Sequence, residues 1–382
     1  MTMRIAFRTD ASLQIGTGHV MRCLTLADAL RAQGAQCHFI CREHLGHLME
    51  VIRQRGYVVN CLNASTHKAQ ETCKNSVGIT QELHPDLLHQ PDFAVWLGCT
   101  WQTDAQDTAD VLFSLQPDWL VVDHYALDQR WEVALAPHFR HLLVIDDLAD
   151  RQHHCNLLLD QNLGRDPKDY AALVPTHCQV LTGPQYALLR HEFVELRPYS
   201  LQRHQVQPAL CRLMITMGGV DQSNATAQVL QALKTCALPP ESRITVIMGF
   251  AAPWQEEIRE LAAQMPWPTE VLVNVDDMAR RMADSDLVIG AAGSTSLESC
   301  CLGLPTVMVV LADNQQLGAR SLEAARAASL IGELKDISTQ LPIAILDLID
   351  SDRQLSMSLA ASDITDGRGV EKVLHVMGMI NV

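Results

Sequence analysis

The chain has 382 residues, of which 48% are hydrophobic and 19% charged, a balance typical of a globular protein with one large or two ordinary domains. Its formal net charge of −15 argues against a nucleic-acid partner and against binding to an anionic membrane surface. An anionic ligand would therefore need a local pocket of basic or dipolar groups.

The N-terminal residues and the cysteines indicate a cytoplasmic protein. The opening MTMRIAFRTDASLQ contains no apolar run of the kind found in signal peptides, and no later apolar stretch is long enough to span a membrane. The twelve cysteines are irregularly spaced, without paired CxxC motifs, so we expect reduced thiols and no metal site. Cys155, next to His153 and His154, gives the one local cluster of metal-binding residue types.

In the first half of the chain, short continuous apolar runs predict strands that are buried on both faces of a parallel sheet. In chain order we expect a strand at 4–10, a helix at 20–34, and strands at 37–43, 119–125, 141–148 and 156–160. The polar, weakly periodic stretch 63–92 is expected to be an insertion.

The second half repeats this alternation. In chain order we expect a strand at 211–219, a helix at 226–236, strands at 243–249, 270–275 and 286–293, a helix at 294–303, a strand at 306–313 and a last helix at 370–380. Alternating strands and helices predict an α/β fold with two Rossmann-like domains, each built on a parallel sheet. We expect domains at 1–195 and 211–382, a linker at 196–210 and an active-site cleft between the domains.

The first motif, GTGHVMR at 16–22, follows the first strand and opens a helix. Gly16 and Gly18 permit a tight turn, and a helix start offers free N–H groups and a positive dipole end. A dinucleotide fingerprint would need a further glycine where Met21 stands, so a dinucleotide cofactor is disfavoured. His19 is then a candidate general base at the helix start, although a simple turn-capping role is also open.

The second motif, GAAGSTSLESCCLGLP at 290–305, follows another predicted strand. Ser294 and Thr295 offer hydroxyl and N–H groups at a helix start, and Glu298 can accept hydrogen bonds from a ribose diol. This arrangement suits a nucleoside diphosphate, but the same residues also fit an ordinary capping box.

Two further motifs carry polar residues at strand ends, where α/β proteins build their sites. MGGVDQSNAT at 217–226 contains Gly219, Asn224 and Thr226 and is equally compatible with a structural turn. The remaining candidates follow the strands of the first half, and most are expected to be structural: Asp123, His124, Tyr125, Asp146, Asp147, Asp160 and Asn162.

Taken together, the ordered motifs resemble one family, the UDP-sugar hydrolases of pseudaminic acid biosynthesis (the PseG family). The resemblance extends from residue 4 to about residue 315 and is carried by R-x-D with GTGH-x-x-R, VVDHYALD, IDDLADR-x-H-x-C with LLLDQN, GPQYALLR-x-EF, MGG-x-D-x-x-N-x-T and GAAGSTSLESCCLGLP with ADNQ. It implies a GT-B fold similar to the lipid II glycosyltransferase MurG. It also implies inverting, metal-independent hydrolysis of UDP-2,4-diacetamido-2,4,6-trideoxy-β-L-altropyranose to UDP and the free sugar, in a pathway that serves flagellin glycosylation.

Residue by residue, the resemblance implies His19 as the catalytic group, no cofactor and a small-molecule UDP-sugar as the partner of a monomeric enzyme. Ser294, Thr295 and Glu298 would bind the uridine nucleotide, and Asn314 and Gln315 would reach the sugar. The full set of expected substrate-binding residues is Arg8, Asp10, Gly16, Gly18, Arg22, Tyr125, Tyr186, Arg190, Gly219, Asn224, Ser294, Thr295, Glu298, Asn314 and Gln315.

The sequence departs from the family pattern where Ala292 and Leu297 replace a glycine and a tryptophan, and neither change removes a proposed catalytic group. Other functions stay open on the same fold: a glycosyltransferase that uses a UDP-sugar donor, a non-catalytic nucleotide-sugar binding module, or a hydrolysing UDP-sugar 2-epimerase.

Overall fold

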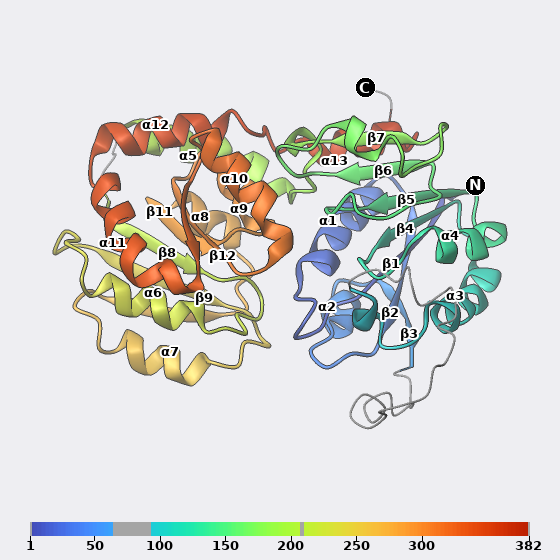
Figure 1. The fold of residues 1–382 in the computed structure, drawn as a ribbon, viewed down its shortest axis with the longest axis horizontal. Coiled ribbons are helices and arrows are strands. Elements are labelled where there is room, and N and C mark those ends of the chain that lie inside the picture. The colour runs from blue at the N-terminus through green and yellow to red at the C-terminus, as the bar shows by residue number, and fades with distance from the viewer. Residues whose placement is uncertain (1, 64–92, 207–209, 381–382) are drawn as a thin grey trace, which may run out of the picture. The chain divides into compact units, whose positions relative to one another are not determined.

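The computed structural model describes residues 2–63, 93–206 and 210–380 (Figure 1). The insertion expected at 63–92 therefore lies outside the described residues, except for Asn63. By their contacts, residues 1–15, 34–158 and 170–179 form one compact unit, and residues 16–33, 159–169 and 180–382 form the other.

The first sheet has seven strands in the order β3-β2-β1-β4-β5-β6-β7, and its pairings from β3 to β5 are parallel. The strands are β1 (Arg4–Thr9), β2 (Gln36–Arg42), β3 (Val58–Leu62), β4 (Trp119–Asp123), β5 (His141–Ile145), β6 (Leu157–Asp160) and β7 (Gln179–Thr182). The strands expected here are confirmed, and the structure adds β3 and β7, which the sequence analysis does not predict.

The second sheet has six strands in the order β10-β9-β8-β11-β12-β13, all paired in parallel. They are β8 (Arg212–Thr216), β9 (Arg243–Met248), β10 (Thr269–Val273), β11 (Leu287–Ala291), β12 (Thr306–Val310) and β13 (Ser329–Glu333). The predicted α/β class with two parallel, Rossmann-like sheets is thereby confirmed.

Helices connect most successive strands, although β5, β6 and β7 follow one another without an α-helix between them. They are α1 (Gly18–Ala32), α2 (Met49–Gln54), α3 (Trp101–Leu115), α4 (Gln129–Leu135), α5 (His191–Val206), α6 (Ala225–Leu233), α7 (Gln255–Ala262), α8 (Met278–Ala283), α9 (Thr295–Leu302), α10 (Gln316–Ala324), α11 (Ile337–Leu348), α12 (Ser351–Ser362) and α13 (Gly369–Val376). The helices predicted at 20–34, 226–236, 294–303 and 370–380 correspond to α1, α6, α9 and α13.

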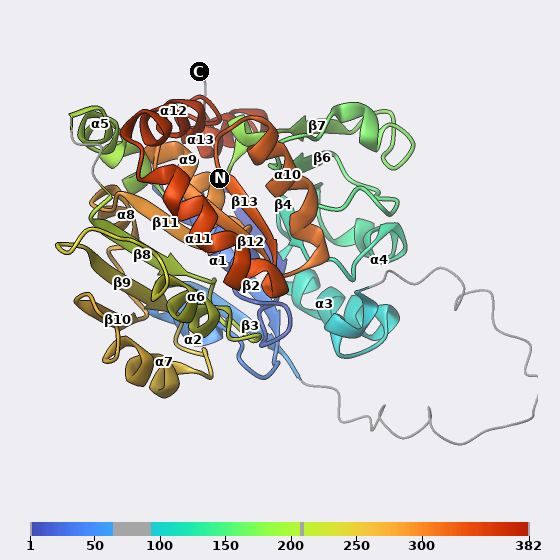
Figure 2. The same ribbon diagram turned by 60° about the vertical axis from the view of Figure 1, so that its left-hand side comes forward.

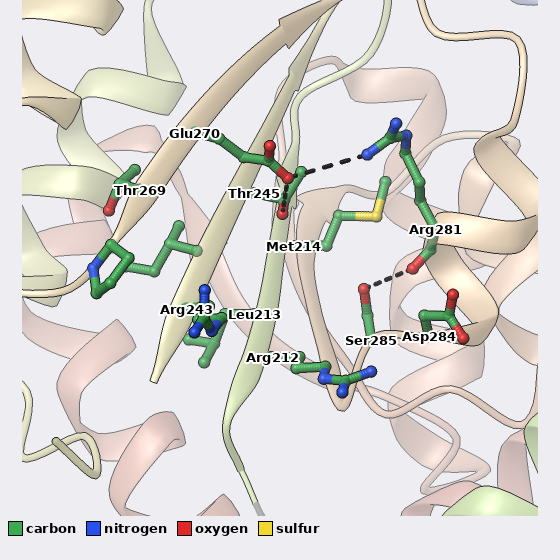
Figure 3. Close-up of a pocket in the computed structure, with 12 residues that line it drawn as sticks. Arg212, Leu213, Met214, Arg243, Thr245, Thr269, Glu270, Arg281, Asp284 and Ser285 are labelled. Carbon is green, nitrogen blue, oxygen red and sulfur yellow. Dashed lines mark hydrogen bonds and ion pairs between the residues drawn. The ribbon is translucent and has the colours of Figure 1, made fainter. Parts of the chain in front are cut away.

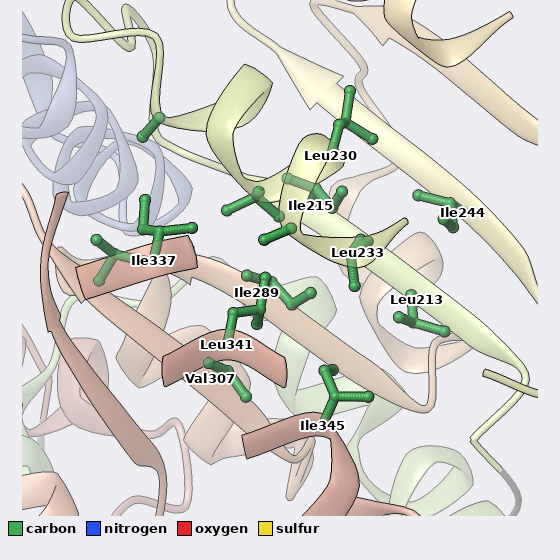
Figure 4. Close-up of a cluster of buried hydrophobic side chains, with 14 of the residues drawn as sticks. Leu213, Ile215, Leu230, Leu233, Ile244, Ile289, Val307, Ile337, Leu341 and Ile345 are labelled. Atoms are coloured by element: carbon green, nitrogen blue, oxygen red, sulfur yellow. The ribbon is translucent and has the colours of Figure 1, made fainter. Parts of the chain in front are cut away.

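The second sheet is buried on both faces, as its continuous apolar strands predict. Leu213 and Ile215 of β8 point into the cluster that Figure 4 shows, where they meet Leu230 of α6 and Leu341 of α11. Met214, between them in sequence, belongs to the cluster on the opposite face. This alternation is the two-residue period of a strand.

Different helices cover the two faces of this sheet. Helices α6 and α11 contact each other over one face, where Figure 2 shows them side by side. On the other face, Phe193 of α5, Met282 of α8 and Leu302 of α9 pack against Val288.

The strand order reverses at β1 in the first sheet and at β8 in the second. In open α/β sheets, ligands bind beyond the carboxyl ends of the strands at such a reversal. The residues that follow β1, β2 and β4, and those that follow β8, β11 and β12, are therefore at the places where a site is expected.

Most of the expected linker at 196–210 is helical, because α5 continues to Val206, and the expected domain bounds stay a prediction. Its polar composition and internal Pro198 conceal the helix from a sequence reading. Arg197 ties α5 to the rest of its unit. Its guanidinium donates hydrogen bonds to the backbone oxygens of Cys301, Ser362 and Thr365. Residues 207–209 lie outside the described residues.

The last helix, α13, contacts the short 3₁₀ helix η5 (Pro184–Tyr186) that follows β7. Gly369 allows this close approach, since a Cβ there would lie only 2.3 Å from the backbone oxygen of Ala187. A larger residue at 369 would separate the two segments.

Candidate functional site

Asp10 joins three strands at the carboxyl edge of the first sheet. It follows β1, and its Oδ1 lies 2.7 Å from Arg8 Nη1 and accepts a 2.7 Å hydrogen bond from the backbone N–H of Arg42, the last residue of β2. Its Oδ2 faces Nε2 of His44 at 3.5 Å and Nε2 of His124, directly after β4, at 3.4 Å. Asp10 therefore fixes the ends of β1, β2 and β4 relative to one another.

Asp104, in α3, balances the positive charge beneath this edge. It accepts hydrogen bonds from Nη2 of Arg8 at 2.6 Å, from Nη2 of Arg42 at 2.8 Å and from Nε1 of Trp131 at 3.0 Å. All of these side chains are buried. Buried charges are tolerated when they are paired and hydrogen-bonded in this way.

The ionisation states within this network follow from its contacts. Burial alone would raise the pKa of Asp10, but Arg8, with His124 and His44, outweighs it and holds that pKa well below its usual range. The pKa of Asp104 is lowered in the same way, because Arg8 and Arg42 outweigh its burial. Burial lowers the pKa of His124, although Asp10 opposes the effect. At neutral pH the two carboxyl groups are therefore ionised and His124 is neutral.

The contacts of His124 assign its tautomer. Its Nδ1 accepts the backbone N–H of Ala126 at 3.1 Å, so in the neutral ring the hydrogen is on Nε2 and points at Asp10. With neither nitrogen available, His124 is suited to orienting Asp10. Arg8 and Asp10 are fully buried and hold this edge of the sheet together, and their expected contact with substrate stays a prediction.

The GTGH motif forms the turn into α1. Gly16 has a φ of +78°, in the left-handed region that favours glycine, and α1 begins at Gly18 with His19 as its second residue. His19 and Arg22 are each 8% exposed, and Arg22 Nη2 lies 3.4 Å from His19 Nδ1. The predicted pair is thus brought together in the first turns of α1.

Tyr125 is more enclosed than a ligand-binding residue would be. It is 3% exposed, and its hydroxyl donates a 2.6 Å hydrogen bond to Asp147. Its ring packs against Trp96 and Phe93. These contacts hold the Tyr125 side chain in place, and its expected contact with substrate stays a prediction.

The acidic residues after β5 and β6 are bound by their own neighbours. Asp146 accepts hydrogen bonds from the Tyr170 hydroxyl and pairs with Arg151, which outweighs the effect of burial and lowers the pKa of Asp146 to about 2. Asp160 pairs with Arg165 at 2.9 Å. The structural role expected for most strand-end carboxylates fits these contacts.

At the carboxyl edge of the second sheet, the turn that contains Ser294 and Thr295 follows β11 and leads into α9. Ser294 is the exposed N-cap residue and makes no side-chain capping bond, so it does not form the capping box that was the alternative interpretation. The first backbone N–H groups of a helix have no partner within the helix, and its positive end attracts anions. This turn therefore offers donors for an anionic group.

Glu298 and Arg190 meet beside this turn. Arg190 Nη2 lies 3.4 Å from Glu298 Oε1, and Nη1 lies 2.7 Å from Oε1 of Glu192. Burial raises the pKa of Glu298, and Arg190 opposes that rise. Arg190 also lies over the Phe193 ring, 5.0 Å from its centroid, which fixes the guanidinium.

The turn after β8 is held by its backbone conformation and by hydrogen bonds from its own residues. Gly218 has a φ of +83°, and the backbone of Gly219 approaches Gly249 so closely that a Cβ on Gly249 would lie 2.0 Å from the Gly219 oxygen. Asn224 has a φ of +54° and donates to Glu257 at 3.0 Å. Asp221 supplies the capping acceptor for α6, because it binds the N–H groups of Ala225 and Thr226.

Asn314 and Gln315 lie in a 3₁₀ turn, η6 (Asp313–Gln315), after β12. Gln315 Oε1 accepts the backbone N–H of Leu311 at 2.9 Å. Its Nε2 lies 3.9 Å from where a Cβ on Gly293 would stand. Gln315 therefore lies between the loops after β11 and β12, whereas Tyr186 lies half-buried in η5.

Sequence reasoning missed Arg42, His44 and Asp104, which complete the network around Arg8 and Asp10. The sequence gives one indication for Arg42. It is the last residue of a mostly apolar strand, so its charge would need a buried partner. Asp104 gives no such signal, because an acidic residue in the first turn of a helix is ordinary.

A hollow of about 560 Å³ lies at the opposite, amino-terminal edge of the second sheet (Figure 3). It is lined by the first residues of β8, β9 and β10, among them Arg212, Arg243 and Thr269. None of the expected site residues lines it, so it is separate from the candidate site.

Within residues 2–63, 93–206 and 210–380, no three His, Cys, Asp or Glu side chains gather closely enough to hold a metal ion. In the same residues, no helix combines the length and apolar character needed to cross a membrane.

Comparison with known proteins finds similarity to proteins named as enzymes that act on UDP-sugars. Residues 212–372 match the glycosyltransferase family 28 C-terminal domain. The UDP-2,4-diacetamido-2,4,6-trideoxy-beta-L-altropyranose hydrolase of Campylobacter jejuni is 23% identical over 316 residues, which cover 82% of this chain and 94% of the hydrolase. The uncharacterized protein MJ1062 of Methanocaldococcus jannaschii is 23% identical over 311 residues, 80% of this chain, which spans only 55% of that relative.

Among solved structures, MurG of Acinetobacter baumannii has a TM-score of 0.68 at 15% identity, and the match covers 99% of this chain and 100% of MurG. At this identity the match concerns the fold alone. These comparisons confirm the expected resemblance to the hydrolase family and to the MurG-like fold.

Proposed function

We propose that this chain is an inverting, metal-independent hydrolase that cleaves the glycosidic C–O bond of UDP-2,4-diacetamido-2,4,6-trideoxy-β-L-altropyranose, as the name of the Campylobacter relative indicates for that protein. The observation that carries the proposal is the glycine turn at Gly16, which delivers His19 into the first turn of α1 beside Arg22. The similarity to the hydrolase over 94% of its length supports it.

The chemistry needs a positioned water, a base and compensation of the diphosphate charge. The unprotonated ring nitrogen of His19 takes the proton from a water that attacks the anomeric carbon, while UDP departs from the opposite face. A general base of this kind contributes about 10²- to 10⁴-fold to the rate. Because UDP is a good leaving group, no strong general acid is required.

The second sheet supplies the nucleotide site in this proposal. The N–H groups at the start of α9, with the Ser294 and Thr295 hydroxyls, donate hydrogen bonds to the diphosphate oxygens. Glu298, held by Arg190 at 3.4 Å, accepts hydrogen bonds from the ribose hydroxyls. These assignments match the roles expected from the sequence.

The test is turnover of the diacetamido-altrose nucleotide in water enriched in ¹⁸O, followed by mass spectrometry and NMR. We expect ¹⁸O in the free sugar and none in UDP, with inversion at the anomeric carbon. His19→Ala should lose about 10²- to 10⁴-fold in kcat and keep its UDP affinity. His191→Ala, which changes an exposed histidine paired with Glu195, is the matched control and should keep full activity. Undiminished turnover in His19→Ala would exclude His19 as the base.

A glycosyltransferase is the second candidate, because residues 212–372 match a glycosyltransferase domain. The same experiment separates the two functions. UDP that forms only after an acceptor is added, with the sugar joined to that acceptor, would establish transfer and reject hydrolysis.

A further inference from the structure

Two cysteines far apart in sequence lie side by side in the first sheet. The sulfur of Cys155, just before β6, is 3.5 Å from the sulfur of Cys178, just before β7. Next to them, the backbone N–H of Gln179 donates to the oxygen of Asn156 at 2.9 Å. The two main chains are thus already at the spacing of paired strands, about 4.8 Å, which lies within the Cα separation that a disulfide requires.

The two thiols differ in access. Cys155 is 1% exposed, whereas Cys178 is partly open to solvent. The Cys155 thiol is directed at the Cys178 sulfur, which lowers the pKa of Cys178 and raises that of Cys155. An accessible thiol that ionises readily beside a buried thiol is the arrangement of an attacking and a resolving cysteine.

We propose that Cys155 and Cys178 form a reversible oxidation site that reacts with low-molecular-weight disulfides such as glutathione disulfide. The Cys178 thiolate attacks one sulfur of glutathione disulfide and releases one glutathione thiolate. Cys155 then loses its proton and attacks the Cys178 sulfur, which releases the second glutathione. The dithiol is oxidised to a disulfide while one glutathione disulfide is reduced to two glutathione molecules.

The site differs from the metal site that His153, His154 and Cys155 suggest in the sequence. His153 Nδ1 is bound to Glu132 at 2.6 Å, and His154 packs edge-on against His177 with ring centroids 6.2 Å apart. The two sulfurs therefore have each other as neighbours, and the histidines have other contacts.

The test uses the full chain, incubated with mixtures of reduced and oxidised glutathione, quenched with an alkylating reagent and digested with trypsin. Cleavage after Arg151, Arg165, Lys168 and Arg190 places the two cysteines in separate peptides, 152–165 and 169–190. We expect these two peptides to become disulfide-linked as the glutathione disulfide fraction rises, and to separate again on reduction.

Two variants resolve the order of events. Cys155→Ala should accumulate glutathione on Cys178, because no resolving thiol is present, whereas Cys178→Ala should leave Cys155 alkylated and unmodified by glutathione. Cys61→Ala, which removes an exposed cysteine of β3, is the matched control and should leave the linked peptides unchanged. The proposal is overturned if both cysteines stay fully alkylated in conditions where Cys61 of the native chain forms a mixed disulfide.

Discussion

Arg8 and Asp10 form a fully buried ion pair in which Arg8 Nη1 lies 2.7 Å from Asp10 Oδ1. Arg8 also binds Asp104 through two nitrogens, so one guanidinium serves two buried carboxylates. Burial would lower the pKa of Arg8, but the two carboxylates raise it well above its ordinary value. The charge of Arg8 is therefore a permanent part of the fold.

Arg8→Met should remove this charge and leave Asp10 and Asp104 poorly compensated. Breaking a buried pair costs about 3–5 kcal/mol of the free energy of unfolding, measured by denaturant titration. Arg31→Met is the control, because Arg31 and Asp28 form an exposed pair at 2.9 Å. Its cost should stay below about 1 kcal/mol, and equal losses in the two variants would refute the importance of burial.

Glu298→Ala tests the nucleotide site. A hydrogen bond to a charged group contributes about 1.5–3 kcal/mol, so we expect UDP affinity to fall by about 10- to 100-fold in calorimetric titration. Glu192→Ala is matched to it, since Glu192 also pairs with Arg190 but lies in α5. If both variants bind UDP as tightly as the native chain, Glu298 does not contact the ribose.

His204, near the end of α5, gives a pH-dependent stability. Burial, with a smaller effect from Arg203, lowers its pKa from 6.5 to about 4. Between pH 6.5 and pH 4 the folded chain keeps His204 neutral, while the unfolded chain binds a proton there. The contribution of neutral His204 to the free energy of unfolding is therefore complete above pH 6.5 and is lost as the pH falls toward 4. The loss should amount to about 3 kcal/mol.

His204→Leu provides the measurement for this effect. The free energy of unfolding of the native chain should fall more steeply between pH 6.5 and pH 4 than that of the variant, by about one proton. Parallel pH profiles would mean that His204 titrates normally in the folded chain.

Asp221→Ala should destabilise α6, because Asp221 binds the N–H groups of Ala225 and Thr226. Loss of a capping acceptor costs about 1–2 kcal/mol, visible in thermal and denaturant unfolding. Asn224→Gly is the companion variant, since glycine adopts the φ of +54° without strain and should change stability little. A larger loss for Asn224→Gly than for Asp221→Ala would reverse this assignment of the cap.

The sequence predicts the central strands well, because β1, β4, β8 and β11 are buried on both faces and therefore read as continuous apolar runs. The edge strand β3 is partly exposed and leaves a weaker pattern, and Pro198 conceals α5. The apolar pattern of the sequence therefore predicts a strand most clearly where both faces of that strand are buried.

The candidate site was predictable only in part. His19, Ser294 and Glu298 stand in glycine-bearing motifs at helix starts, so the sequence marks them. Arg42 and Asp104 are 62 positions apart and act through a pairing that exists only once β2 and α3 have packed. Sequence spacing carries no information about such a contact, and the same reason conceals Cys155 beside Cys178.

The close packing of Gly369 on the segment after β7 has a consequence for synthesis of the protein. The contact joins residues 184–187 to residues 369–376, so it forms only after residue 376 has left the ribosome. Until then, the surface that α13 covers is exposed on the nascent chain. A polypeptide that ends before Gly369 would lack α13 and leave residues 184–187 uncovered, so we expect this segment to become accessible to proteases.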